Sequence, residues 1–329
     1  MKINIISESE FFPKNHGVHT AYLNHVSMLK KLGADVVVNS LKNAHITHLH
    51  TAGPLGLHKL FTSKKIVVSA HVMPSSFEGS YIGAKYWSGS ARKYLKFFYN
   101  KADLVLAVAP KVKLELRKIG VTQRIEIFPN AIDTVMFRRD EALRSLGRKR
   151  FRLDKDKKVI LGVGQVQPRK GISYFIKIAK ELPEFTFIWV GDKPFKGLTA
   201  ENEELRQLLR YPPKNFISAG GFPYSKMPQV YNAADIFFFP SFQENASMSI
   251  IEAASCGLPL ILRDLEEYRL LYKEGYLSAR KSDEFKKHIQ RLFSNKNLFE
   301  QQRKESFNLA RKFSYEALGN KLLNYYQDL

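Results

Sequence analysis

Short apolar runs alternate with longer amphipathic segments along the chain. The apolar runs have the length and composition of buried β-strands. Strands are predicted at Ile3–Ser7, Asp35–Val38, Ile46–His50, Ile66–Ala70, Leu104–Ala107, Ile125–Phe128, Val159–Val163, Thr186–Gly191, Asn215–Ala219, Ile236–Pro240 and Leu258–Leu262. Helical patterns between them include Thr20–Leu32, Pro110–Ile119, Ile172–Leu182, Tyr224–Ala233 and Ser247–Cys256. This alternation predicts an α/β fold whose parallel sheets are covered by helices on both faces.

One charged segment, residues 138–158 (RRDEALRSLGRKRFRLDKDKK), interrupts the alternation. Because it has little apolar content, we interpret it as a linker between two doubly wound domains, residues 1–145 and 146–312. A final helix within residues 313–329 is expected to cross back to the first domain. The chain of 329 residues is long enough for two cores. Since ligands of such sheets bind at the carboxyl ends of the strands, an interdomain cleft is the expected site.

The net charge of +21 indicates an anionic partner such as nucleic acid, acidic lipid or a phosphorylated substrate. Residues 1–150 contain 24 Lys and Arg against 10 Asp and Glu, which places most of the excess in the first half. The single Cys256 excludes an internal disulfide and fits a reducing compartment. The start, MKINIISESEFF, is too polar for a signal peptide, and no window approaches the ~20 apolar residues of a spanning helix. A cytoplasmic protein, soluble or peripheral on a membrane, is expected.

Two carboxylates stand in the stretch QENASMSIIEAASCGLP, at Glu244 and Glu252. Ser247 is a suitable N-cap for a helix that carries Glu252 and ends at Gly257. The start of such a helix attracts phosphate, which a nearby carboxylate would repel unless it binds hydroxyl groups. A nucleotide sugar, with hydroxyls at both ends and phosphates between them, would satisfy both acids. The alternative is a solvated loop residue and an ordinary helical glutamate.

A glycine-bracketed turn between a strand and a helix, residues 162–171 (GVGQVQPRKG), carries Arg169 and Lys170. It can bring backbone N–H groups and cations against a pyrophosphate, although glycines in this position often only form a turn. It lacks the GxGxxG and Walker patterns. The sequence DKD at Asp154 and Asp156 lies in the charged segment, and we interpret it as a solvated charge run rather than a metal motif.

The order of these motifs resembles the retaining family-4 glycosyltransferases, which have the GT-B fold. The resemblance rests on VGQVQPRKG and NFISAGGFPYSKMPQVYNAADIFFFPSFQENASMSIIEAASCGLPLI, preceded by FFPKNHGVHTAYLNHVSMLKKLG, ITHLHTAGPLG, VVSAHV, ADLVLAVAP and FPNAIDTVMF. The tail FSYEALGNKLLNYY extends it over nearly the whole chain. The resemblance implies two Rossmann-like domains facing a cleft, with the nucleotide sugar in the C-terminal one.

Residue by residue, the resemblance implies that Glu252 holds the ribose hydroxyls and Glu244 the donor-sugar hydroxyls. Lys170 would bind the pyrophosphate, and Gln165 stands where the family usually has a second cation, an arginine. His71 matches the histidine that hydrogen-bonds the donor sugar, although the aspartate often found after it is Val72 here. The expected catalytic residues are therefore His71, Glu244 and Lys170.

Further donor-binding residues are expected in the same motifs. They are Gly17 of the loop NHGVH, Gln165, Arg169, Lys170, and the run Glu244, Asn245, Ala246, Ser247 and Met248 with Glu252. The resemblance implies a UDP-sugar as substrate, no cofactor, no strict need for a metal, and front-face attack with retention that needs no protein nucleophile.

The segment from Tyr81 to Lys101 interleaves aromatic and basic residues. On a helix, Trp87, Ala91, Tyr94, Leu95 and Phe98 share one face, and basic residues flank it. This is typical of an interfacial helix on anionic lipid, and the alternative is a core-packing helix with a basic solvent face. The expected membrane-binding residues are Lys85, Trp87, Arg92, Lys93 and Lys96.

The segment LRDLEEY at 262–268, together with VGQVQPRKG, is similar to the diacylglycerol-glycolipid branch of the family. That similarity implies hexose transfer from a UDP-sugar to diacylglycerol or monoglucosyl-diacylglycerol, on the inner face of the cell membrane. Alternatives are lipopolysaccharide or capsular polysaccharide synthesis, a non-catalytic GT-B scaffold, and a basic nucleic-acid-binding protein. No nucleic-acid-binding module is recognisable, so no nucleic acid is expected as a partner.

Overall fold

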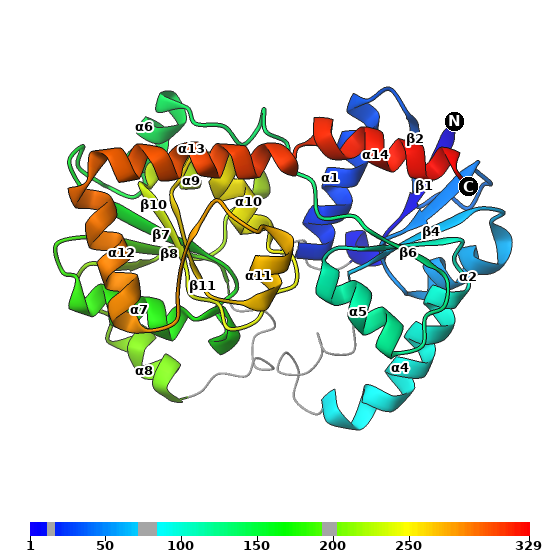
Figure 1. Ribbon diagram of the computed structural model, residues 1–329, viewed down its shortest axis with the longest axis horizontal. Helices are drawn as coiled ribbons and strands as arrows, with labels where there is room; N and C mark the ends of the chain where they lie inside the picture. Colours follow the sequence, from blue (N-terminus) through cyan, green and yellow to red (C-terminus); the bar gives the residue numbers. More distant parts are fainter. Residues whose placement is uncertain (12–16, 72–83, 193–202) are drawn as a thin grey trace. The chain divides into compact units, whose positions relative to one another are not determined.

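The computed structural model describes residues 1–11, 17–71, 84–192 and 203–329, with the backbone alone for 84–88. The chain forms two compact units, Met1–Asp133 with Phe313–Leu329 (unit 1) and Thr134–Lys312 (unit 2). Each unit contains one six-stranded sheet whose neighbouring strands all run parallel (Figure 1). The inner strands of both sheets are buried at almost every position, whereas the edge strands are partly exposed, so the apolar runs of the inner strands follow from coverage by helices on both faces.

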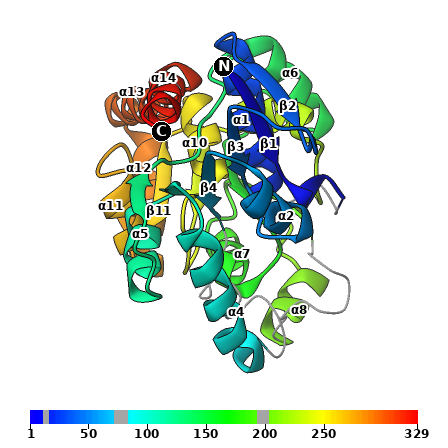
Figure 2. The ribbon, with the colours of Figure 1, turned by 90° about the vertical axis from the view of Figure 1, so that its right-hand side faces the viewer.

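In unit 1 the strand order is β2-β1-β3-β4-β5-β6. The strands are β1 (Lys2–Ile6), β2 (Asp35–Val38), β3 (Ile46–Leu49), β4 (Ile66–Ala70), β5 (Leu104–Ala107) and β6 (Arg124–Ile127). Figure 2 shows β1, β3 and β4 side by side. The helices are η1 (Glu8–Phe11), α1 (Gly17–Lys31), α2 (Pro54–Thr62), α4 (Ala84–Asn100), α5 (Pro110–Lys118) and α14 (Tyr315–Gln327).

In unit 2 the strand order is β12-β11-β10-β7-β8-β9. The strands are β7 (Val159–Val163), β8 (Thr186–Val190), β9 (Phe216–Ser218), β10 (Ile236–Phe239), β11 (Leu260–Arg263) and β12 (Leu277–Ala279). The helices are α6 (Glu141–Arg150), η2 (Pro168–Lys170), α7 (Ile172–Glu181), α8 (Glu203–Arg210), η3 (Tyr224–Lys226), α9 (Met227–Ala233), α10 (Met248–Ser255), α11 (Glu266–Leu271), α12 (Ser282–Ser294) and α13 (Lys296–Lys312). The winding direction reverses between β7 and β10, which is the topological switch point of this sheet.

The prediction of two parallel, helix-covered sheets is confirmed, and every predicted strand is present to within two residues at each end. One strand was not predicted: β12 has only three residues, of which Ala279 alone is buried. The predicted helix Tyr224–Ala233 begins as a 3-10 turn before α9. The division of roles between the domains, and the cleft between them, stay predictions.

The interpretation of residues 138–158 as a linker is wrong, because the whole segment belongs to unit 2 and its residues Glu141–Arg150 form helix α6. Asp140 caps this helix by accepting from the N–H groups of Ala142 and Leu143. The helix lies so close to α9 that a Cβ on Gly147 would come within 2.1 Å of the Gln229 carbonyl oxygen. The cationic side chains of α6 pair with acids of unit 2: Arg144 donates to Asp235 at 2.7 Å. The predicted domain boundary at 145/146 therefore falls inside a helix.

The charge excess is not a property of unit 1. Counted by structural unit, unit 1 contains 19 Lys and Arg against 10 Asp and Glu, and unit 2 contains 33 against 21. A count over residues 1–150 places more of the positive charge in the first half, because it includes the basic residues of 138–150, which belong to unit 2. Overall charge therefore does not single out unit 1 as the one that meets an anionic surface.

The C-terminal helix α14 packs beside α1 in unit 1 (Figure 1). Tyr315 donates from its hydroxyl to Asn24 Oδ1 at 2.7 Å, and the Tyr326 hydroxyl lies 2.6 Å from His48 Nδ1. A parallel bridge between Ile132 and Ser314 joins the start of this tail to the end of the first segment of the unit. Among the described residues, no helix is long and apolar enough to cross a membrane.

Candidate active site

The loops that follow β7 and β10 lie side by side in unit 2, because these two strands are hydrogen-bonded neighbours at the switch point. The loop 164–171 carries Gln165, Arg169 and Lys170, and the loop 240–247 carries Glu244. Ligands of doubly wound sheets bind at this position, outside the carboxyl ends of the strands. The sheet topology thus brings together motifs that are about 75 residues apart in the sequence.

The two loops are joined by their backbones. The Phe242 N–H donates to the Arg169 carbonyl oxygen at 2.8 Å, and Ser241 Oγ lies 3.0 Å from the same oxygen. Gly171 has a φ of 76°, and a Cβ there would lie 2.2 Å from the Pro240 carbonyl oxygen. Only glycine combines this left-handed conformation with so close an approach. The Gly-bracketed turn is therefore built to place Arg169 and Lys170 against the end of β10.

Lys170 and Glu244 form a largely buried ion pair across these loops, with side chains 13% and 6% exposed. Lys170 Nζ lies 2.5 Å from Glu244 Oε1, and Ser241 Oγ donates to the same oxygen at 2.8 Å. Burial lowers the pKa of Lys170, although the adjacent Glu244 carboxylate opposes this shift. Because Glu244 is only 7% exposed, its interpretation as a solvated loop residue is wrong.

The other residues of unit 2 that were predicted to bind the donor lie in the same loops or at the start of α10. Arg169 donates from Nε to Gln167 Oε1 at 2.9 Å. Ser247 is the N-cap residue of α10, as predicted, but its hydroxyl contacts Ser249 Oγ at 2.9 Å and does not cap the helix. Residues Gln165, Asn245, Ala246 and Ser247 are partly exposed, and Met248 is buried.

Glu252 lies on α10 and accepts a hydrogen bond from the Tyr231 hydroxyl at 2.6 Å. It is buried, so it is not an ordinary solvated glutamate. Burial raises the pKa of Glu252 to about 7, and the hydrogen bond from Tyr231 partly counteracts this by favouring the carboxylate. A carboxyl group with this pKa can lose its proton near neutral pH and then accept hydrogen bonds from hydroxyl groups.

In unit 1 the predicted site residues are His71 and Gly17. His71 follows β4, and its Nε2 lies 3.1 Å from His50 Nδ1. Burial lowers the pKa of His71 to about 4, so the ring is neutral at pH 7. Gly17 is the exposed first residue of α1, and a Cβ there would meet no atom of the described residues within 4 Å. Asn15 and His16 of the same motif, and Val72 after His71, lie outside the described residues.

Helix α4 carries the predicted membrane-binding residues. Arg92, Lys93 and Lys96 are exposed, whereas the side chains of Lys85 and Trp87 lie outside the described residues. The apolar face proposed to meet lipid is buried in unit 1 where it is described: Leu95 and Phe98 are in the core, and Tyr94 donates to the Ala52 carbonyl oxygen at 2.8 Å. That part of the interpretation is wrong, because the helix covers the protein core with this face.

Some residues of the site were missed by sequence reasoning. Tyr231 and Ser241 hydrogen-bond the two acids, and His25 and His50 extend inward from His71. Ser241 follows a predicted strand end directly, which is a usable signal in a doubly wound sheet. The two histidines and Tyr231 lie in apolar helical or strand patterns that predict only burial.

Comparison with known proteins identifies the family. Residues 144–309 match the family of glycosyl transferases group 1, and residues 5–135 match Glycosyltransferase Family 4. The alpha-galactosylglucosyldiacylglycerol synthase of Streptococcus pneumoniae is 31% identical over 99% of this chain and 89% of its own. The processive diacylglycerol alpha-glucosyltransferase of Acholeplasma laidlawii is 25% identical over 100% of this chain and 98% of its own.

Solved structures agree on the fold. HepE of Anabaena, in complex with UDP and glucose, has a TM-score of 0.78 at 16% identity, covering 100% of both chains. The sucrose-phosphate synthase of Thermosynechococcus elongatus has a TM-score of 0.81 at 15% identity, covering 99% of this chain and 98% of its own. The predicted GT-B class of two doubly wound α/β domains is confirmed. The chain therefore belongs to the glycosyltransferases, with a Family 4 region followed by a group 1 region.

Proposed function

We propose that this enzyme transfers a hexose, with retention of configuration, from a UDP-sugar to diacylglycerol or monoglucosyl-diacylglycerol at a membrane surface. The observation that carries the proposal is the buried pair of Lys170 and Glu244 at the switch point of unit 2, with Glu252 on the adjoining helix. The two full-length relatives support the lipid acceptor, since both are named for diacylglycerol glycolipids. HepE, solved with UDP-glucose, supports a nucleotide-sugar donor.

The donor is proposed to bind with its phosphates against the loop 164–171 and the start of α10. Lys170 and Arg169 would supply cations, and the first N–H groups of α10 would supply dipoles, for the charge that develops as UDP departs. Glu252 would accept hydrogen bonds from the ribose and Glu244 from the sugar. His71 would hydrogen-bond the sugar, and Gly17 would leave room for the phosphates, as the family resemblance implies.

The reaction breaks the bond between the anomeric carbon and the leaving phosphate oxygen and forms one from the same carbon to the acceptor hydroxyl oxygen on the same face. The proton of that hydroxyl passes to the departing phosphate oxygen. Positive charge develops on the sugar and negative charge on the pyrophosphate, so electrostatic stabilisation is the main task of the protein. Lys170, Arg169 and the α10 dipole meet that task on the leaving-group side. We propose that these groups suffice without a divalent metal.

Membrane contact is proposed for an exposed face of unit 1 formed by α4 and the end of α2. Phe61 is 65% exposed and Phe97 is 41% exposed, with ring centroids 6.3 Å apart. Lys101 Nζ lies 6.0 Å and 5.9 Å from these two centroids. Exposed aromatic rings beside cations are suited to the headgroup region of anionic lipid. This face, with Arg92, Lys93 and Lys96, replaces the buried apolar face of α4 in the proposal.

The enzyme is proposed to act at the inner face of the cell membrane, where it binds peripherally from the cytoplasm. Anionic lipids, the lipid acceptor and the nucleotide sugar are the proposed partners, and nucleic acid is not among them.

A transfer assay tests the proposal. The purified protein is incubated with radiolabelled UDP-glucose or UDP-galactose and mixed micelles of diacylglycerol or glucosyl-diacylglycerol with anionic lipid. Labelled glycolipid is the expected product, and digestion with an α-specific or β-specific glycosidase reports its configuration. Absence of labelled lipid, with both donors and both acceptors, would favour the polysaccharide or scaffold alternatives.

A further inference from the structure

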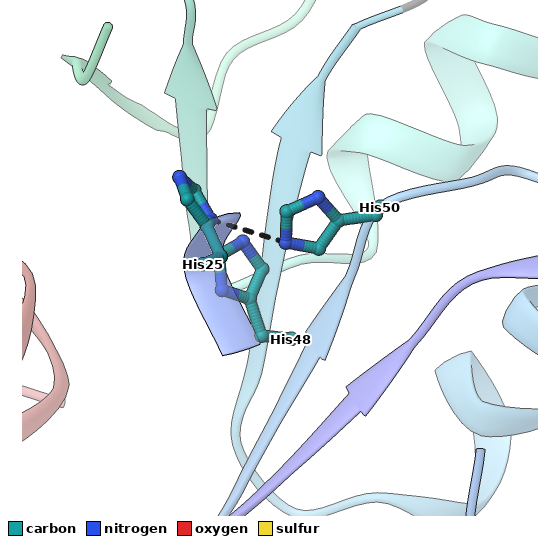
Figure 3. Close-up of side chains that lie close together, drawn as sticks. All are labelled: His25, His48 and His50. Carbon is teal, nitrogen blue, oxygen red and sulfur yellow. Dashed lines mark hydrogen bonds between the residues drawn. The ribbon is translucent and has the colours of Figure 1, made fainter. Parts of the chain in front are cut away.

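Four histidines lie together in unit 1. His25 comes from α1, His48 and His50 from β3 and the residue after it, and His71 from the end of β4. His25, His48 and His50 point toward one another from these elements (Figure 3), and each is at most 2% exposed. The proposed function uses His71 alone, so the other three require an explanation.

Three of these rings form a continuous hydrogen-bonded chain. His25 Nδ1 lies 3.1 Å from His50 Nε2, and His50 Nδ1 lies 3.1 Å from His71 Nε2. Each of these nitrogen pairs requires one proton between two lone pairs. Burial lowers the pKa of His25 to about 3 and that of His50 well below its usual value, so the rings are neutral with one N–H each.

Neutral rings allow two proton arrangements in such a chain. If the N–H groups point toward His71, then His25 Nε2 carries no proton and presents only a lone pair. If they point the other way, His25 Nε2 carries an N–H. That atom is buried and has no hydrogen-bond partner among the described residues. A buried N–H without an acceptor is rarer in proteins than an under-used acceptor, so the chain favours the first arrangement.

We propose that His25 and His50 are positioning residues that determine which nitrogen of His71 carries its proton. His25 donates to His50, His50 donates to His71 Nε2, and His71 Nδ1 therefore holds the remaining proton. Nδ1 is then the ring nitrogen that donates to an oxygen of the bound sugar. This inference rests on the proposed function for the role of His71, but not for the proton arrangement.

A metal site is the competing interpretation of the same cluster. His25, His48 and His50 can each offer a nitrogen, and these nitrogens lie within 4.8 Å of one another. However, both nitrogens of His48 are already engaged, with the Tyr326 hydroxyl at 2.6 Å and Ser69 Oγ at 2.8 Å. Both nitrogens of His50 are engaged as well. A metal would have to break these bonds, so the hydrogen-bonded chain is the better account.

The proton arrangement can be measured directly in the wild-type protein. Two-dimensional ¹⁵N–¹H NMR of histidine-labelled protein distinguishes a protonated from an unprotonated ring nitrogen. We expect Nδ1 of His71 to be protonated and Nε2 unprotonated. The opposite pattern would overturn the proposal, and so would Zn²⁺ binding that raises the melting temperature of wild type but not of His25→Phe. The spectrum of wild type decides the matter even if a variant fails to fold.

Variants test the influence of His25 on His71. His25→Phe removes the donor, so we expect the proton of His71 to move from Nδ1 toward Nε2 and kcat to fall on the order of 10-fold with little change in donor KM. His25→Asn retains an N–H near the Nδ1 position and should restore both. The matched control His58→Phe changes an exposed histidine of α2 and should alter neither. An unchanged His71 spectrum in His25→Phe would refute the proposal.

The activity assay tests the role of His71 in the reaction, and the NMR spectrum tests the positioning role of His25 and His50. Full activity in His71→Ala would refute the proposed role of His71 in the reaction, whatever the wild-type spectrum shows. A His71 spectrum opposite to the expected one, together with an inactive His71→Ala, would refute the positioning role alone.

Discussion

The Tyr231 hydroxyl donates to Glu252 Oε2 at 2.6 Å, inside the buried face of α10. The bond favours the carboxylate form, while burial of Glu252 favours the neutral form and raises its pKa to about 7. The carboxyl group of Glu252, which we propose binds the ribose, therefore titrates near neutral pH. Its charge state should respond to pH, to Tyr231 and to the nucleotide.

UDP affinity is expected to increase with pH through about 7. Hydroxyl groups donate stronger hydrogen bonds to a carboxylate than to a neutral carboxyl group. UDP affinity should therefore fall with the ionised fraction of Glu252, by about 10-fold from pH 8 to pH 6. Titration calorimetry measures this, with Glu252→Gln as the control that retains only the titration of UDP itself. Equal pH profiles for wild type and Glu252→Gln would contradict the assignment.

The same shift makes a stability prediction for the protein without nucleotide. In the unfolded chain Glu252 ionises near 4.5, and in the folded protein near 7. Between these values the folded state binds the extra proton, so the contribution of Glu252 to the free energy of unfolding falls as pH rises. Saturating UDP should remove this trend, because the bound form keeps Glu252 ionised and the folded state then binds no extra proton.

Tyr231→Phe should raise the pKa of Glu252 further and weaken UDP binding at pH 7 by about 5- to 10-fold, the loss of one hydrogen bond to a charged group. Binding should recover at higher pH, where Glu252 ionises without help. Calorimetry at several pH values measures the displaced midpoint. Tyr211→Phe, at an exposed tyrosine, is the matched control. An unchanged midpoint in Tyr231→Phe would show that the bond does not tune Glu252.

Lys170→Gln should lower kcat/KM for transfer by roughly 10²- to 10³-fold, the typical cost of removing one preorganised group from a developing charge. Its effect should exceed that of Arg169→Gln if the buried cation is the main one. Lys177→Gln removes an exposed lysine paired with Glu204 and serves as the control. A kcat/KM within threefold of wild type for Lys170→Gln would remove this residue from the catalytic set.

Charge reversal of Arg92, Lys93 and Lys96 to glutamate should weaken binding to anionic vesicles at low salt by at least about 100-fold, at about 1 kcal/mol for each cation near the surface. Flotation or co-sedimentation measures the bound fraction. The control reverses Lys287, Arg291 and Lys296, which are exposed residues of unit 2. Equal losses in both variants would indicate non-specific attraction, and no loss in the first would exclude the α4 face.

Asp235→Asn tests the reassignment of α6 to unit 2. Asp235 accepts from Arg144 at 2.7 Å and from the Val159 N–H at 2.8 Å, so the substitution leaves a partly buried arginine without its counter-charge. We expect the free energy of unfolding to fall by about 3 kcal/mol in urea titrations. Asp283→Asn, at an exposed pair with Lys286, should cost less than about 1 kcal/mol. Similar costs for both would indicate that α6 is only loosely attached.

The fold was largely predictable because buried parallel strands read as continuous apolar runs. Among these buried strands, Ile66–Ala70, Leu104–Ala107 and Val159–Val163 have the predicted bounds, and so does the partly exposed edge strand Asp35–Val38. β12 was missed because two of its three side chains are not buried, so its pattern does not differ from a loop. Helix α6 was missed because its cations form pairs with Asp235 inside the unit, and such pairing is a tertiary contact that composition does not reveal.

For the candidate site, the sequence predicts which motifs lie together but not which side chains hydrogen-bond one another. Glu244, Glu252 and Lys170 stand in recognisable sequences, and the switch point brings their loops together. The bond from Tyr231 to Glu252 joins residues on two different helices, and the sequence pattern does not show that these two side chains meet. The apolar face of α4 fits lipid and protein equally well as a pattern, and only the fold shows that Leu95 and Phe98 are buried.

The central claim is that Glu252 and Glu244 hold the two ends of a nucleotide sugar whose phosphates meet Lys170. A crystal structure with bound UDP tests it most directly. The account predicts the ribose hydroxyls within hydrogen-bond distance of Glu252 and a phosphate oxygen within reach of Lys170 Nζ. A uridine bound elsewhere on the protein, away from α10 and the loops after β7 and β10, would contradict the account.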